Sequence, residues 1–213
     1  MVSRGRRGAY KVGVVRRAKI VETAADRFAR DGYRRTSMAQ IAEDAEITDS
    51  GLLHHFPSKQ HLLLAVVQHR MSDADQWWEQ ADPQAGAVAT LARMVEATRR
   101  YLSRPGLIEL FVHLMSEAAE PSSAAHTLYS RQYENVVAAI AERFRFSVST
   151  GDVHADLDCD ALARECIAVS DGLQLQWVLT EGRLDLAGAI RSHADRLARS
   201  ITTDGSGLPS EHS

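Results

Sequence analysis

Residues 36–63 read TSMAQIAEDAEITDSGLLHHFPSKQHLL, and this stretch decides the fold. Ser37 with a glutamine three residues later has the spacing of a capping box, which predicts that a short helix begins after Ser37. After a break at residues 45–47, Thr48 is expected to cap a second short helix that extends to about Phe56. Two short helices on a tight turn are the arrangement that places one helix in the major groove of DNA.

The helix pair has too few apolar residues to form a core of its own, so it must pack on the preceding helix. That helix is predicted over residues 12–31, because Ile20, Ala24 and Phe28 recur at helical spacing and share one side. We therefore predict a three-helix DNA-binding domain of the helix-turn-helix type over residues 12–57.

The remainder of the chain is also predicted to be helical, because its apolar residues recur at intervals of three and four. We expect an all-α fold of about nine helices, with a larger helical domain over residues 58–202 for effector binding and dimerisation. Residues 146–158 are predicted to form a loop that lacks the spacing of a calcium site. Residues 1–11 are expected to be a flexible basic tail, and residues 203–213 a polar tail.

The charge is distributed unevenly along the chain. The net charge is −3, yet residues 1–63 carry +5 and residues 64–213 carry −8. A basic head on an acidic body orients the head toward phosphate groups. No apolar run has the length of a signal peptide or of a membrane span, so we expect a cytoplasmic protein that does not bind membranes.

The sequence offers little support for an enzyme. It contains no glycine-rich phosphate loop, no nucleophile elbow and no metal-binding cluster, so we predict no catalytic residue, no cofactor and no metal. His113, Glu117 and His126 lack a further ligand at fixed spacing. Cys159 and Cys166 are expected to be buried thiols, because their spacing does not suit a zinc site.

Residues 17–63 resemble the DNA-binding domain of the TetR (tetracycline repressor) family of bacterial transcription regulators. The segment DGLQLQWVL at residues 171–179 is also similar to the eighth helix of one branch of the family. Two residues depart from the family pattern: Glu46 stands where glycine is usual, and His54 where tyrosine is common. The resemblance rests on Ala24, Phe28, Gly32, Thr36, Ser37, Ile41, Ala42, Ala45, Gly51, Leu52, His55, Phe56, Ser58, Lys59, Leu62 and Leu63.

The resemblance implies a homodimeric, ligand-responsive regulator, more specifically a repressor. Such a protein binds a palindromic operator in double-stranded DNA and is released by a small-molecule effector. The basic tail either enters the minor groove or remains solvated. The candidates for DNA contact are Thr36, Ser37, Thr48, Ser50, Gly51, His54, His55 and Lys59, together with Arg4, Arg6 and Arg7 of the tail.

The body supplies candidates for a ligand pocket and a dimer interface. Large or soft side chains line apolar pockets; here they are Trp77, Trp78, Met94, Tyr101, Phe111, His113, Met115, Tyr129, Tyr133 and Trp177. The last two helices are expected to form the interface through Leu162, Cys166, Val169, Leu173, Trp177, Leu186, Ile190 and Leu197. The alternative is a helical adaptor for protein interactions that has lost DNA binding, which the carboxylate of Glu46 in the turn would favour.

Overall fold

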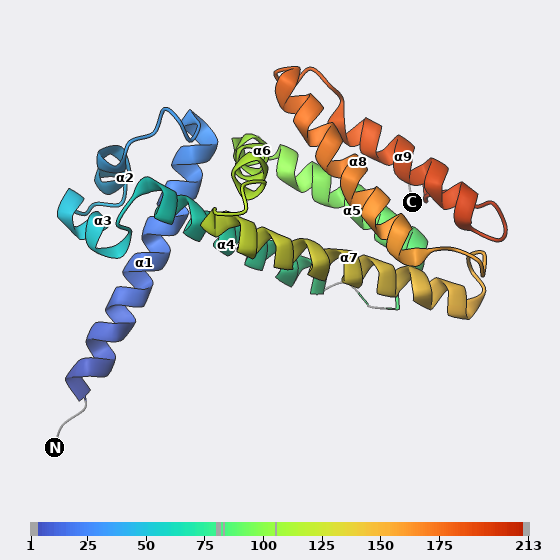
Figure 1. Cartoon of the computed structure of the whole chain (residues 1–213), viewed down its shortest axis with the longest axis horizontal. Helices are drawn as coiled ribbons and strands as arrows, with labels where there is room; N and C mark the ends of the chain where they lie inside the picture. The colour runs from blue at the N-terminus through green and yellow to red at the C-terminus, as the bar shows by residue number, and fades with distance from the viewer. Residues whose placement is uncertain (1–3, 80–81, 83, 105, 211–213) are drawn as a thin grey trace.

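The computed structural model describes residues 4–79, 82, 84–104 and 106–210, with the side chains of 1–12, 70–81 and 124 outside the description. The described residues form nine α-helices and no β-sheet, which confirms the predicted all-α fold (Figure 1). The helices are α1 (Arg4–Asp31), α2 (Met38–Asp44), α3 (Asp49–His55), α4 (Lys59–Glu79), α5 (Gly86–Leu102), α6 (Gly106–Ala118), α7 (Ala124–Thr150), α8 (Cys159–Leu179) and α9 (Leu186–Ile201).

Helices α1–α3 form a head at one end of the molecule, and α4–α9 form the body (Figure 1). The predicted caps of α2 and α3 are confirmed. The Ser37 hydroxyl accepts from the Gln40 amide at 3.2 Å, and the Gln40 side chain accepts from the Ser37 amide at 2.8 Å. The Thr48 hydroxyl accepts from the Gly51 amide at 3.1 Å, so both helices begin where their caps require.

The head has no separate core. Phe28, Ile41, Leu52 and Phe56 are each at most 1% exposed, and each contributes roughly 1.5–3 kcal/mol by burial. The same cluster of buried side chains continues without interruption into the body. Its members beyond the head include Leu62, Leu63, Val66, Leu107, Leu110 and Leu114 of α4 and α6. Helices α4 and α6 therefore belong to the packing of both parts.

A second core holds the body together. Helix α5 packs along α9, and α7 packs along α8, so that the last helices cover the middle of the chain (Figure 1). Phe144, Leu91 and Leu186 are buried at the centre of this core. None of the helices in the described part of the chain combines the length and hydropathy needed to cross a lipid bilayer.

Two predicted boundaries are wrong. Helix α1 begins at Arg4, so residues 4–11 continue the helix instead of forming a flexible tail. No proline interrupts this stretch, and a helix that is already nucleated gains one hydrogen bond for each added residue.

Helix α7 extends to Thr150, so the predicted loop is shortened to the residues after it. The polar residues near the end of α7 suggested a loop, but Ser147 is buried, and its hydroxyl accepts from the Ala87 amide at 2.8 Å. Gly151 then ends the helix in the left-handed conformation, with φ of 80°.

Candidate DNA-binding surface and ligand pocket

Helix α3 turns one side to solvent and the other to the core. Ser50 and His54 are exposed, whereas Leu52 is fully buried. Gly51 and His55 are partly exposed, and the Ser50 hydroxyl lies 3.1 Å from that of Thr48. The side chains at the start of α3 are small, so they leave its free backbone amide groups accessible. Such a surface allows close approach to the phosphate groups and base edges of DNA.

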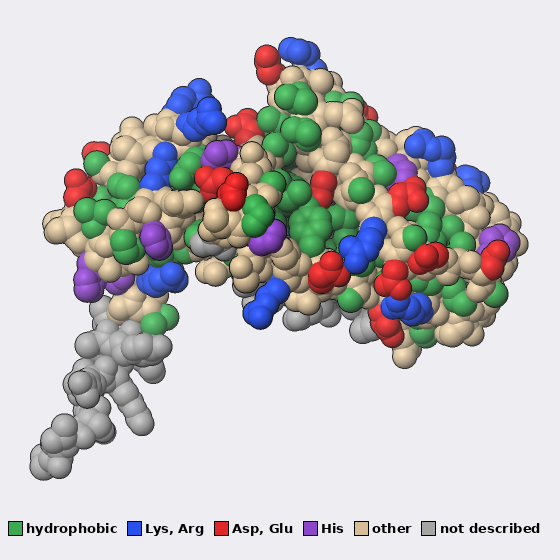
Figure 2. Space-filling model, in the orientation of Figure 1, with side chains coloured by type: hydrophobic (Ala, Val, Ile, Leu, Met, Phe, Trp, Pro, Cys, Tyr) green, Lys and Arg blue, Asp and Glu red, His purple; other side chains and the backbone are tan. Residues whose placement is uncertain are grey.

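Positive charge gathers beside α3. Burial lowers the pKa of His55, and the neighbouring His54, Arg16 and Arg17 lower it further. The guanidinium group of Arg17 lies 4.7 Å from the centre of the Phe56 ring, so α1 brings cations to the edge of α3. Figure 2 shows histidine and basic side chains on this part of the head.

Lys59 stands at the start of α4, where head and body meet. Its ammonium group lies 4.2 Å from the centre of the Tyr33 ring, and burial lowers its pKa. The Tyr33 ring packs against His113 of α6, with 4.9 Å between ring centres. Lys59 is therefore positioned by contacts that extend to the body.

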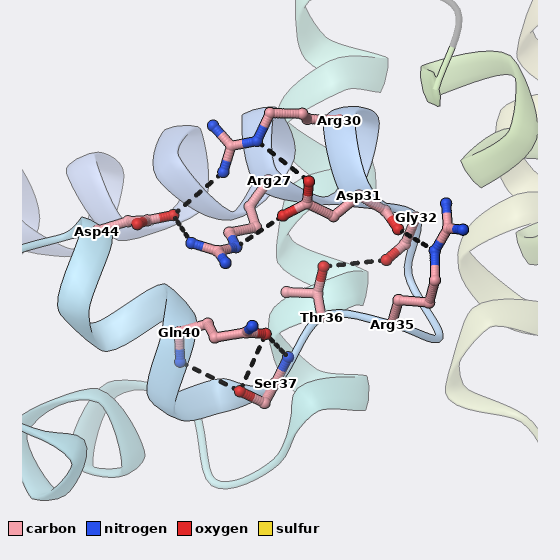
Figure 3. Close-up of polar contacts among 9 residues, drawn as sticks. All are labelled: Arg27, Arg30, Asp31, Gly32, Arg35, Thr36, Ser37, Gln40 and Asp44. Atoms are coloured by element: carbon pink, nitrogen blue, oxygen red, sulfur yellow. Dashed lines mark hydrogen bonds and ion pairs between the residues drawn. The ribbon is translucent and has the colours of Figure 1, made fainter.

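An ion-pair network fixes the orientation of α2 on α1 (Figure 3). Arg27 contacts Asp44 at 2.6 Å and Asp31 at 3.0 Å, and Arg30 contacts Asp31 at 3.2 Å. The Arg27 side chain is only 16% exposed, so water screens the two contacts of Arg27 less than it screens an exposed ion pair.

Thr36 does not suit the predicted contact with phosphate. The residue is 2% exposed, and its hydroxyl donates to the Gly32 carbonyl at 3.0 Å (Figure 3). The side chain therefore completes the end of α1. Ser37 remains exposed beside it. The side chains of Arg4, Arg6 and Arg7 lie outside the described residues.

Glu46 adopts the left-handed conformation that glycine would favour at this place in the turn, with φ of 58°. Its carboxylate is held at 2.8 Å by the Lys19 ammonium of α1, which lowers the pKa of Glu46. The acidic group at the turn therefore has a positive partner within the head.

The body encloses a cavity of about 230 Å³ among α4–α8. Five of the predicted pocket residues line it: Met94, Tyr101, Phe111, Tyr129 and Tyr133. Its wall includes Leu107, Leu110 and Leu114 of α6, which also belong to the core shared with the head. A ligand in this cavity would contact the helix that packs on α1.

Three other predicted pocket residues, His113, Met115 and Trp177, do not line the cavity. His113 packs against Tyr33, and the Met115 sulfur lies 3.1 Å from the Tyr133 hydroxyl oxygen. Trp177 packs in the body core instead, because it lies on a different side of α8. The side chains of Trp77 and Trp78 lie outside the described residues.

Our sequence analysis missed the non-aromatic polar residues of the cavity wall, which are Thr98, Gln132, Ser170, Asp171 and Gln174. Three of these residues share one side of α8 with Ile167, at intervals of three and four. The sequence did contain a signal for these three residues. They share a side of the helix with the apolar Ile167, and the sequence analysis already expected that helix to be buried.

Asp171 is the acid of the cavity. The Tyr133 hydroxyl donates a hydrogen bond to its carboxylate. Burial raises the pKa of Asp171 to about 6, although the hydrogen bond from Tyr133 opposes this effect. Burial and the same hydrogen bond raise the pKa of Tyr133.

Helices α8 and α9 form an outer face with a shallow groove between them. The groove is lined by Ala168, Val169, Gly172, Leu173, Gln176, Ala189, Ser192, His193 and Arg196. On α8, Leu175 is 44% exposed and Leu179 is 71% exposed. Figure 2 shows hydrophobic side chains at the surface over α8. This outer face is available to a partner.

The predicted interface is only partly compatible with this face. Cys166, Leu186, Ile190 and Leu197 are at most 8% exposed and belong to the core of their own chain, so they cannot face a partner. Leu162, Leu173 and Trp177 also pack against that core, although Leu173 lines the outer groove as well, together with Val169. Helix α8 has one apolar stripe that packs on its own core and another outside it, and the predicted set drew mainly on the first.

A helix-turn-helix head joined to a helical body with an internal cavity defines a class of DNA-binding transcriptional regulators. The sequence profile of bacterial regulatory proteins of the tetR family matches residues 20–66. The profile of the C-terminal domain of BetI-type transcriptional repressors matches residues 87–202. The chain therefore belongs to the TetR family, and it is a transcriptional regulator.

Individual proteins resemble the chain over most of its length. The HTH-type transcriptional regulator TtgR of Pseudomonas putida is 26% identical over 189 residues, which span 84% of this chain and 88% of TtgR. A regulator from Saccharomonospora viridis, solved in complex with choline, has 25% identity and a TM-score of 0.73, covering 87% of this chain and 97% of its own. A regulator from Haloarcula marismortui, 18% identical, shares the fold with a TM-score of 0.75 over 89% of this chain and 100% of its own.

Proposed function

We propose that the chain acts as a homodimeric repressor that binds a palindromic operator and leaves it when a small molecule occupies the cavity. The observation that carries this proposal is the shared position of α6, which lines the cavity and packs on α1 of the head. The match to BetI-type repressors supports repression, and the choline complex of the Saccharomonospora viridis protein supports a small-molecule effector.

The DNA contacts are proposed for the exposed side of α3 and the helix starts beside it. The proposed set is Ser37, Thr48, Ser50, Gly51, His54, His55 and Lys59. Glu46 was the feature that favoured an adaptor without DNA binding. Its pairing with Lys19 supports the regulator instead, because the carboxylate is offset within the head.

The proposed dimer pairs the outer faces of α8 and α9. One helix-turn-helix reads only half a site, whereas two heads related by a two-fold axis read a palindrome with half-sites about one helical turn apart. The small residues Ala168, Gly172 and Ala189 leave room for the partner's helices, and the exposed Leu175 and Leu179 would be covered.

Release requires that the ligand prefer a conformation in which the heads do not fit the operator. Helix α6 is the element through which this preference reaches the head. The backbone of Gly106 lies so close to the Ala29 carbonyl that a Cβ atom there would clash with it. A movement of α6 would therefore displace α1. The ligand and the operator must then weaken each other's binding by the same factor.

The test is a mobility-shift titration of full-length protein with duplex DNA from the region beside its gene. Binding should weaken steeply as salt is added, and Lys59→Ala should weaken it alike on all duplexes, lowering the salt slope by about 1. The control is Arg145→Ala, which removes an exposed cation near the far end of α7 (Figure 1). If both variants bind like the wild type, or if no duplex is bound, the proposal is wrong.

A further inference from the structure

The cavity contains one carboxylate and, among the described residues that line it, no basic side chain. Asp171 lies in a wall that is otherwise made of aliphatic and aromatic residues with a few neutral polar groups. A charge held away from water without a partner of opposite sign is costly. The cavity therefore favours a ligand that carries a positive group.

The contacts of Asp171 do not provide that positive group. Its carboxylate accepts from the Tyr133 hydroxyl, which is neutral, and no described cation contributes to the shift of its pKa. The hydrogen bond holds the carboxylate at the cavity wall. An anionic ligand would bring a second negative charge to this place and would be repelled.

Aromatic rings complete the site. The Phe111 and Tyr129 rings lie 6.4 Å apart, and the Tyr129 and Tyr133 rings lie 6.5 Å apart, with each pair tilted. Tyr101 adds a further ring from α5. The faces of such rings attract alkylammonium groups, and the attraction is strongest where water is excluded.

We infer that the cavity binds an apolar organic cation, either an amine or a quaternary ammonium compound, with Asp171 as its counter-ion and the tyrosine rings around it. This inference rests on the proposed function, because it assigns a chemical class to the effector of the same cavity. It names the residue that distinguishes this class from neutral and anionic compounds of equal shape.

The test compares two probes of one shape and different charge. Titration calorimetry of the full-length protein, without DNA, measures binding of 3-hydroxyphenyltrimethylammonium and of 3-tert-butylphenol, in which carbon replaces the charged nitrogen. We expect the cation to bind about tenfold more tightly or better, since charge pairing and ring contacts both favour it. An anion, 4-tert-butylbenzoate, should not bind.

Asp171→Asn should abolish the preference, leaving the two probes within about twofold of each other. The matched control is Glu165→Gln, which removes an exposed acid from the same helix and should preserve the preference. Should Asp171→Asn fail to fold, the wild type provides the second measurement. Its preference for the cation should shrink below about pH 6, because Asp171 takes up a proton there and loses its charge. The other titratable side chains among the described residues of the wall are Tyr101, Tyr129 and Tyr133.

Equal binding of the two probes, tighter binding of the phenol, binding of the benzoate or failure of the cation to bind would each overturn the inference. The proposed function is judged separately, by DNA binding alone. Cation binding that depends on Asp171 but leaves the DNA complex intact would support the inference and contradict the proposed release mechanism.

Discussion

Asp171 links the chemistry of the cavity to the stability of the fold. Burial raises the pKa of its carboxyl from 3.8 to about 6. A carboxyl with a raised pKa in the folded state prefers to be protonated there. Its contribution to stability is fully present below pH 3.8, the ordinary value, and is lost as the pH rises through about 6.

The unfolding free energy of the ligand-free protein should therefore include a component that falls with rising pH, by up to about 3 kcal/mol. Asp171→Asn should remove this component. The measurement is urea unfolding of both proteins at several pH values between about 4 and 7.5, where the difference between the two curves isolates this carboxyl. A difference that stays constant across this range would contradict the burial of the charge.

A second prediction for a single residue concerns the effect of Glu46 on the unfolding free energy. The left-handed backbone of this residue costs about 1 kcal/mol, whereas its exposed ion pair with Lys19 is screened by water and contributes less. Glu46→Gly should thus raise the unfolding free energy slightly, by less than about 1 kcal/mol, as measured by urea unfolding. Lys19→Ala, which removes the pair and leaves the strain, should lower it. A clear loss of stability in Glu46→Gly would show that the pair outweighs the strain.

At the scale of elements, local signals predicted the capped starts of α2 and α3, but not the start of α1 or the end of α7. Ser37 and Thr48 cap α2 and α3 as their sequence contexts predict, because a cap is decided within three residues. The end of α7 depends on Ser147, whose partner Ala87 lies on another helix. No local pattern contains that contact.

The residues of the cavity and of the outer face likewise could not be predicted without knowing how the helices pack. The tyrosines on α5 and α7 were found from their size alone. Asp171 and Gln174 were missed because a polar residue on a helix is usually solvated, and only the neighbouring helices turn this side of α8 inward. Which apolar stripe of α8 faces its own core likewise required the position of α9.

The junction of α6 and α1 yields a prediction for an element. Gly106→Ala places a methyl group against the backbone of Ala29, so α6 must shift. We expect a loss of at least about 1–3 kcal/mol of unfolding free energy, measured by urea unfolding, together with weaker DNA binding. The control is Gly13→Ala, which enters open space on α1 and should stabilise the helix by up to about 1 kcal/mol. If the Gly106 variant were as stable as the wild type, the tight junction would be refuted.

At the scale of the whole molecule, the exposed leucines of α8 are unusual for a surface that remains in water. Leu179→Glu should therefore convert the proposed dimer to monomer in sedimentation analysis, because it would bury a carboxylate at the proposed interface. The control is Val15→Glu, which changes an equally exposed apolar residue on α1 and should leave the dimer intact. A Leu179 variant that sediments like the wild type would contradict the proposed interface.

The most direct measurement is the number of chains bound to one operator. Full-length protein is sedimented with a labelled duplex that carries an inverted repeat from the DNA beside the gene, and with a duplex that carries one half of it. The account predicts two chains on the complete repeat at low salt and far weaker binding to the half-site. A single chain on each duplex, or no complex with either, would contradict it.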